Sequence, residues 1–232
     1  MLNLIIAIVL IIVLIILKFI LKINFKELKK LEINKKLENI TDKFPENISI
    51  CKKILRKLKN ENVLVEENKD YKTSLYIVIS NKIIISNLKN SYSRIQTIVH
   101  ECIHSIQNKN LLVFNFVFSN IYLIYLVLSI ICTIFGLFKN SLLQIIILLM
   151  LSFIYYMIRS YLETDAMIRA EYLTKEYIKE KDICTSQEKE ELINAYNKIN
   201  KVGVIVYNYI LFVNCMVKVI SYCLISWIVS YI

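Results

Sequence analysis

Long stretches without charge constrain the fold of this chain more than any other feature. Residues 111–138 form 28 consecutive positions without a charged side chain, and residues 142–158 form a second such run. The final run, residues 202–232, is interrupted only by Lys218. A helix crosses the hydrocarbon core of a bilayer with about 20 apolar residues. Together with the apolar residues 1–21, these runs predict a mainly α-helical membrane protein with about four transmembrane helices.

The N-terminal segment, residues 1–21, is expected to be an uncleaved membrane anchor. A secretory signal peptide carries basic residues before its apolar core and small residues at a cleavage site after it. Here the lysines follow the core, and no such site is present. Because lysine and arginine are enriched on the cytoplasmic side of membrane proteins, we expect residues 22–110 in the cytoplasm and the N-terminus outside.

The two central runs predict a transmembrane hairpin over residues 111–158, with its turn near Lys139. An even number of crossings returns the chain to the face of the membrane from which it left. Residues 159–201 are therefore expected beside residues 22–110, as amphipathic helices with a break near residues 182–186.

Residues 202–232 are expected to form the last span, either straight or bent. A lysine inside a span is a functional candidate by default. Lys218 is expected instead to reach the membrane interface with its long side chain.

Between the anchor and the hairpin, the pattern predicts a small α+β region. Apolar residues recur at helical spacing over residues 24–60, where Pro45 is expected to separate two amphipathic helices. Residues 74–80 and 82–86 are rich in β-branched side chains and flank Asn81, which predicts a short β-hairpin or two short strands. An edge strand here either pairs with a peptide or only supports its neighbours, and the sequence leaves both open.

The net charge of +10 belongs mainly to the segments between the apolar runs. No compact basic motif with interleaved aromatic residues is present, so we expect no nucleic-acid partner. The lysine-rich residues 18–36 fit a contact with anionic lipid headgroups. The six cysteines form no C-x-x-C pair, a pattern that favours neither a zinc ribbon nor a disulfide scaffold.

The chemistry-bearing motif lies in residues 98–107, which read IVHECIHSIQ. His100, Glu101 and His104 form the pattern H-E-x-x-H, and they include both histidines of the chain. Apolar residues around them recur at helical spacing, which predicts a helix over residues 91–109. Side chains at positions i and i+4 share a helix face. The two imidazoles can therefore hold one zinc ion, with Glu101 beside them as a base.

A third metal ligand is expected from the segment that follows the hairpin. The hairpin leaves just after the histidine helix and returns just before Glu163, so that carboxylate should lie on the same side as the histidines. A catalytic zinc with three protein ligands keeps its fourth position for water. The alternative is that Glu163 and Asp165 are ordinary charges at the mouth of a helix, with Asp165 paired to Arg169 four residues later.

These segments resemble the YugP-type membrane zinc metallopeptidases of bacteria. The resemblance rests on residues 98–107, the hydrophobic hairpin and residues 162–170 (LETDAMIRA), and it covers most of the chain. The family shares an N-terminal anchor, an H-E-C-G-H-A-I-Q helix, a membrane hairpin, an E-F-D-A segment and a C-terminal apolar stretch. Two positions depart from this pattern: Ile103 replaces a glycine, and Ser105 replaces an alanine.

The resemblance implies a zinc-dependent peptidase, multi-pass in a bacterial plasma membrane, with a small zincin-like α+β portion in the cytoplasm. Its substrate would be a peptide or protein, membrane-associated ones included. His100, His104 and Glu163 would bind Zn²⁺, and Glu101 would act as the base. The competing hypothesis is a catalytically inactive zinc-binding protein that serves as a binding or assembly factor.

Supporting roles remain open at this point. Asp165 and Gln107 match positions of the family. Asp165 is therefore an alternative ligand, and either residue could orient a ligand side chain by a hydrogen bond to it. Peptide hydrolysis also needs a hydrogen-bond donor for the oxyanion. Because the chain has no third histidine, the candidates for that donor are Tyr161, Arg169 and Tyr172.

Overall fold

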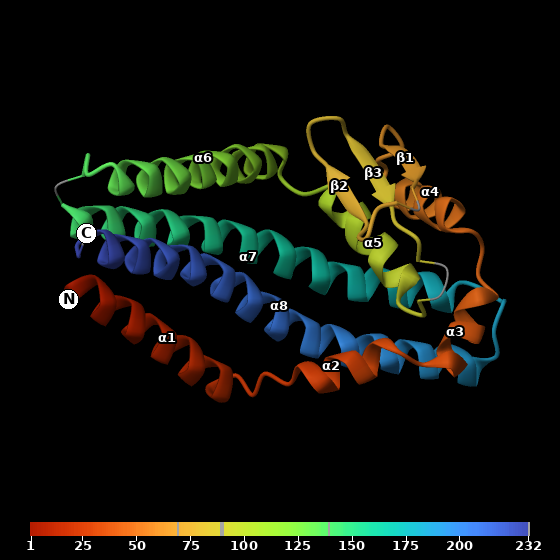
Figure 1. Cartoon of the computed structure of the whole chain (residues 1–232). Helices are drawn as coiled ribbons and strands as arrows, with labels where there is room; N and C mark the ends of the chain where they lie inside the picture. The colour runs from red at the N-terminus through yellow and green to blue at the C-terminus, as the bar shows by residue number, and fades with distance from the viewer. Residues whose placement is uncertain (69, 89–90, 139, 232) are drawn as a thin grey trace. The chain divides into compact units, whose positions relative to one another are not determined.

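The computed structural model describes residues 1–231 except residues 69, 89–90 and 139, so Lys139 at the predicted turn lies outside the described residues. The chain is mainly helical, with a small sheet (Figure 1). In chain order the elements are α1 (Leu2–Ile20), α2 (Phe25–Glu32), α3 (Lys35–Asp42), α4 (Asn47–Lys57), β1 (Leu64–Glu67), β2 (Leu75–Ile77), β3 (Lys82–Ile85), α5 (Arg94–His104), α6 (Lys109–Ile134), α7 (Ser141–Lys179) and α8 (Ser186–Val229).

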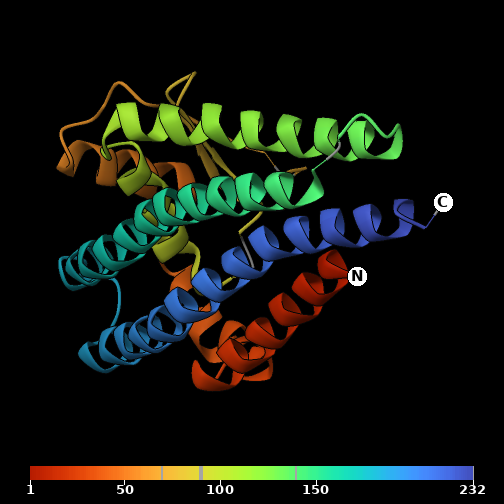
Figure 2. The same cartoon turned by 90° about the vertical axis from the view of Figure 1, so that its left-hand side faces the viewer.

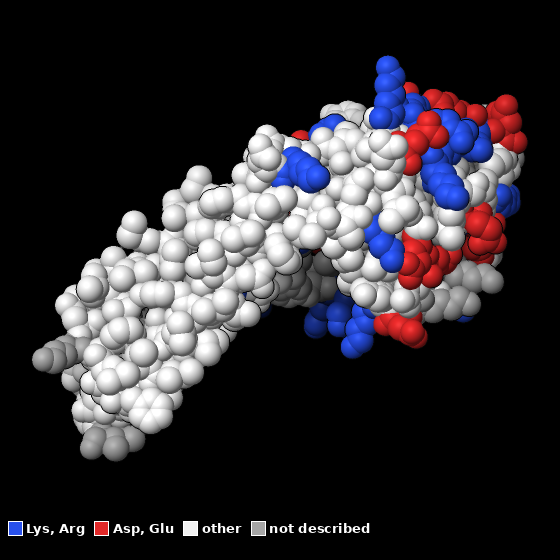
Figure 3. All heavy atoms as spheres, turned by 90° about the horizontal axis from the view of Figure 1, so that it is seen from above, with Lys and Arg blue, Asp and Glu red and all other residues white. Residues whose placement is uncertain are grey.

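The chain divides into two compact units. The apolar unit comprises Met1–Ile23, Phe114–Tyr161 and Ile205–Ile232, and the sheet unit comprises Asn24–Val113 and Leu162–Val204. Helices α7 and α8 therefore contribute residues to both. On the face seen in Figure 3, charged side chains gather in one region and a broad uncharged surface adjoins it.

Four of the described helices, α1, α6, α7 and α8, are long and apolar enough to cross a membrane. This agrees with the predicted number of spans and with a multi-pass membrane protein. Within the apolar unit, α1 runs antiparallel to the last part of α8 (Figure 2). Asn3 donates to the Ser226 hydroxyl, and the Tyr209 hydroxyl donates to the Leu14 carbonyl.

Lys218 projects from α8 onto two aromatic rings of the apolar unit. Its Nζ lies 4.5 Å from the ring centroid of Tyr122 and 5.5 Å from that of Tyr155. An ammonium group is attracted to the negative face of an aromatic ring. The lysine therefore has a local partner for its charge within the helix bundle.

Two predicted segment boundaries fall inside continuous helices. The hairpin is expected to end at residue 158, and the last span to begin at residue 202. Helices α7 and α8 continue across both positions. No glycine or proline lies in Ser141–Lys179, so nothing in that sequence interrupts the backbone hydrogen bonds when the composition turns polar. The predicted break near residues 182–186 is confirmed, because α7 ends at Lys179 and α8 begins at Ser186.

Helix α6 ends at Ile134, and a glycine follows two residues later, as is common where a tight turn follows a helix. Gly136 has a φ angle of +68°, which side chains on other residues disfavour. The Leu137 amide then donates to the Cys132 carbonyl, which satisfies one of the last carbonyls of the helix.

The sheet has the strand order β1-β3-β2. The predicted β-hairpin is confirmed: β2 pairs antiparallel with β3, with Tyr76 opposite Ile83. Strand β1 was not predicted, and it pairs in parallel with β3, with Val65 opposite Ile83. Since β3 is the central strand, β2 is an edge strand of the sheet.

Three helices, rather than the two predicted, occupy residues 24–60. The Asn24 side chain accepts from the amides of Lys26 and Glu27, and that of Asn34 accepts from the Leu37 amide. Each asparagine thus satisfies free N–H groups at a helix start. The second cap begins a separate α3, and Pro45 follows it before α4.

Helix α5 packs against α4 and against strands β2 and β3. Its apolar side chains, including Ile95, Ile98 and Val99, are fully buried in the core of the sheet unit. The first residue of α5, Arg94, is also buried. Its guanidinium donates to the carbonyls of Thr41, Phe44 and Pro45 and to the Asn47 side chain. These bonds fasten the start of α5 to the segment that joins α3 to α4.

Candidate metal centre

The histidines lie on the last two turns of α5, which ends sooner than the predicted 91–109. The helix covers Arg94–His104, and two tight turns follow it. The Ile106 amide donates to the Ile103 carbonyl, and the Gln107 amide donates to the His104 carbonyl. The chain therefore folds back on the helix end, which brings the Gln107 side chain beside His104.

Three ligand-type side chains meet at this end of α5: His100, His104 and Glu163. The Nε2 atoms of the two histidines are 3.0 Å apart. His100 Nε2 lies 3.3 Å from Glu163 Oε2, and His104 Nε2 lies 3.6 Å from Glu163 Oε1. All of these atoms lie within 4.8 Å of one another. The structure thus brings Glu163 to two histidines that lie at least 59 positions earlier in the chain, in an arrangement that could hold a metal ion.

Most of the cluster is shielded from solvent. The side chains of His104 and Glu163 are 9% and 7% exposed, whereas that of His100 is 19% exposed. A buried carboxylate beside two imidazoles is costly unless positive charge is present. This arrangement of donor atoms therefore fits a cation.

Gln107 determines which nitrogen of His104 faces the cluster. Its Nε2 donates to the Leu162 carbonyl at 2.7 Å and to Asp165 Oδ2 at 2.8 Å. Its Oε1 lies 2.8 Å from His104 Nδ1. Because an amide oxygen only accepts, His104 Nδ1 must carry the proton. In the neutral form of His104 the lone pair is then on Nε2, which faces Glu163.

Glu101 is buried next to the cluster, at 7% exposure. Burial raises the pKa of its carboxyl, and the neighbouring His100 and His104 offset part of that rise. The backbone N–H of Tyr76 on strand β2 lowers the pKa of this carboxyl. Strand β2, which packs against α5, therefore lies next to the acidic residue of the motif.

The pKa of His104 is raised overall. Burial by itself lowers it, but the hydrogen bond and negative charge of Glu163 outweigh that effect, and Glu101 adds to the rise. The site therefore stabilises positive charge between its carboxylates.

The remaining predicted site residues lie outside the cluster of ligand atoms. Asp165 contacts Gln107, and Arg169 lies 3.5 Å from Asp165 Oδ2. Tyr172 is 69% exposed, with Lys175 over its ring. Tyr161 belongs to the apolar unit and is 63% exposed.

The other side chains of the motif face the core. Cys102 is fully buried, with its Sγ 3.5 Å from that of Cys51 on α4. Burial raises the pKa of the Cys102 thiol well above its usual value. Ile103, which replaces a glycine of the resembled motif, is 2% exposed. Its bulk therefore fills the core of the sheet unit rather than the site.

Two residues that contact or position the site were not found by sequence reasoning. Tyr76 acts through its backbone N–H. Every residue except proline has this group, so the residue type does not reveal the interaction. Arg94 is a buried charge whose partners are mostly backbone carbonyls. Neither contact has a spacing or composition that could reveal it.

Comparison of this chain with models of protein families, with curated proteins and with solved structures finds no match.

Proposed function

We propose that this chain is a membrane-anchored zinc metallopeptidase. The observation that supports it is the cluster of His100, His104 and Glu163 with Glu101 beside it. In a tetrahedral site, ligand atoms about 2.1 Å from zinc lie about 3.4 Å from one another. The separations of 3.0, 3.3 and 3.6 Å agree with that spacing.

The number of ligands favours catalysis over a purely structural role. A structural zinc site is usually closed by four protein ligands, whereas a catalytic site has three. Among the residues that the structure describes, the ligand group has three members. When bound, zinc supplies a Lewis acid that polarises a carbonyl group and acidifies water.

The residues around the metal position have different roles in the proposed reaction. Glu101 accepts a proton from the attacking water and returns it to the leaving amine. Its raised pKa suits a group that must both take up and release a proton. Gln107 holds His104 in the tautomer that offers Nε2 as a ligand.

Strand β2 gives a surface for the substrate main chain. In an antiparallel pair, the N–H and C=O groups of one residue point to the same side. From the effect of the Tyr76 N–H on the pKa of Glu101, we infer that the main chain of Tyr76 faces away from β3. An extended peptide placed along this edge would pair with β2 next to Glu101. Any peptide that can adopt an extended conformation could pair with β2 in this way.

The test is the variant Glu101→Gln in full-length protein purified in a nonionic detergent. We expect zinc bound as in the wild type, by elemental analysis, and at least 100-fold slower cleavage of a peptide library, by mass spectrometry. Glu190→Gln, which alters an exposed glutamate, serves as the matched control and should cleave normally. Cleavage at the wild-type rate by Glu101→Gln contradicts the proposal. If the wild-type protein binds zinc but cleaves no peptide of the library, the result supports the inactive zinc-binding alternative.

A further inference from the structure

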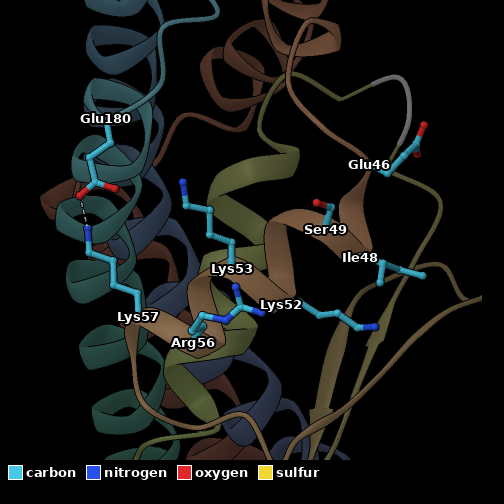
Figure 4. A pocket seen from close by; sticks show the side chains of 8 residues that line it. All are labelled: Glu46, Ile48, Ser49, Lys52, Lys53, Arg56, Lys57 and Glu180. Atoms are coloured by element: carbon cyan, nitrogen blue, oxygen red, sulfur yellow. Dashed lines mark hydrogen bonds and ion pairs between the residues drawn. The ribbon is translucent and has the colours of Figure 1, made fainter.

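A cavity of about 840 Å³ opens to solvent on the outer face of α4. Its ionisable lining consists of four basic and two acidic side chains: Lys52, Lys53, Arg56, Lys57, Glu46 and Glu180 (Figure 4). None of them belongs to the metal centre.

The sequence of α4 places these basic residues on one face. Cys51, Ile54 and Leu55 are buried in the core of the sheet unit. The positions between and after them, Lys52, Lys53 and Arg56, are exposed. Residues three and four apart are neighbours on a helix surface, and like charges at that spacing repel one another. The outer face of α4 thus concentrates positive charge at some cost to the helix.

Only part of this charge is neutralised within the protein. Lys57 pairs with Glu180 at 2.5 Å and with Glu176 at 2.8 Å. Arg56 has an exposed contact with Glu61. For Lys52 and Lys53 the described residues provide no carboxylate at ion-pair distance, and Figure 4 shows the Glu46 side chain pointing away from the lysines.

Lys53 also lies close to another lysine. The Nζ atoms of Lys53 and Lys181 are each 5.6 Å from the ring centroid of Tyr177. Partial burial and the adjacent Lys53 ammonium lower the pKa of Lys181, and the Glu180 carboxylate offsets only part of that fall. Two ammonium groups on one aromatic ring repel each other, and an anion between them would remove that repulsion.

We propose that a phosphate group binds at this cavity, held by Lys53 of its lining and by Lys181, whose ammonium group lies over the same Tyr177 ring as that of Lys53. A phosphate carries more than one negative charge when it is a monoester or the free ion, which matches several ammonium groups better than a single carboxylate does. Arg56 adds a planar donor suited to phosphate oxygens. The cavity volume is within the range of small-ligand sites. Free phosphate supplies this multiple charge, whereas the phosphodiester of a lipid headgroup supplies one negative charge on the same kind of oxygen atoms.

The experiment is isothermal titration calorimetry on metal-free, full-length protein in a nonionic detergent. Two probes are titrated separately: inorganic phosphate, and the soluble short-chain lipid dihexanoylphosphatidylglycerol below its micelle concentration. We expect a dissociation constant of about 1 mM or tighter for at least one of them. Binding of phosphate identifies a free phosphate site, and binding of the lipid alone identifies a headgroup site.

The variants identify where binding occurs. The double variant Lys53→Gln, Lys181→Gln should bind at least about tenfold more weakly. The double variant Lys198→Gln, Lys201→Gln removes the same charge from exposed positions of α8, and it should bind as the wild type does. Lys53→Arg, Lys181→Arg keeps the charge and should retain binding. Absence of binding to both probes overturns the proposal, as does equal binding by the wild type and the Lys53→Gln, Lys181→Gln variant.

Discussion

The Oε1 atom of Gln107 lies 2.8 Å from Nδ1 of His104. The same glutamine donates to the Leu162 carbonyl and to Asp165 on α7. One side chain therefore links the end of the histidine helix to the helix that carries Glu163. The Gln107 side chain orients the His104 imidazole, and it connects the two segments that supply the metal ligands.

Replacing Gln107 with alanine should weaken zinc binding by about 10- to 100-fold, because His104 loses the acceptor that fixes its tautomer. The affinity is measured by competition with a chelating indicator. Gln187→Ala, on the exposed start of α8, is the control and should bind zinc normally. Unchanged affinity in Gln107→Ala would show that His104 needs no such support.

Glu163 and Asp165 should respond differently to replacement. Glu163→Ala removes a member of the cluster, so the purified protein should lose its zinc. Asp165→Ala removes a partner of Gln107 and Arg169 but no member of the cluster, so it should keep zinc at an affinity lowered by about tenfold or less. Metal content is measured by elemental analysis. A zinc-loaded Glu163→Ala together with an empty Asp165→Ala would reverse the assignment.

Removing the metal should lower the thermal stability of the sheet unit. A ligand present at 100 times its dissociation constant stabilises the folded state by about 2.7 kcal/mol. For a chain of this size that corresponds to a fall of about 5–10 °C in Tm after treatment with EDTA. The double variant His100→Ala, His104→Ala should show no shift with EDTA. A shift of the same size in that variant would mean that the chelator acts elsewhere.

Arg94 should be important for stability because four of its hydrogen bonds are buried or partly buried. Arg94→Ala leaves the carbonyls of Thr41 and Phe44 without this donor, at a cost of about 2–4 kcal/mol in the free energy of unfolding. Thermal unfolding followed by circular dichroism measures the loss. Arg56→Ala changes an exposed arginine and should cost less than about 0.5 kcal/mol. Equal effects of the two variants would contradict a structural role for the buried guanidinium.

Pairing of a substrate with β2 should be sensitive to alternate backbone amides. In an extended peptide every second N–H points toward the adjacent strand. N-methylation of those amides in a cleaved peptide should raise KM by about tenfold, and methylation of the intervening amides should have a much smaller effect. Steady-state kinetics on the two methylated series distinguishes them. Equal effects in both series would argue against strand pairing.

Features that depend on neighbouring residues could be predicted from the amino-acid sequence. Charge-free runs predict membrane spans because the bilayer imposes a minimum length. The spacing of His100 and His104 places them on one helix face whatever surrounds that helix. The β-branched segments around Asn81 predict the hairpin for the same local reason.

Which acidic side chain meets the histidines depends on how distant segments of the chain pack together. Glu163 and Asp165 are two positions apart, so a rotation of about 200° about the helix axis separates their side chains, which lie on nearly opposite faces. The sequence contains both and cannot say which way α7 is turned. Packing turns Glu163 toward the imidazoles and Asp165 toward Gln107. Strand β1 and the Tyr76 N–H were likewise fixed by contacts between distant residues, because main-chain groups are identical in every residue.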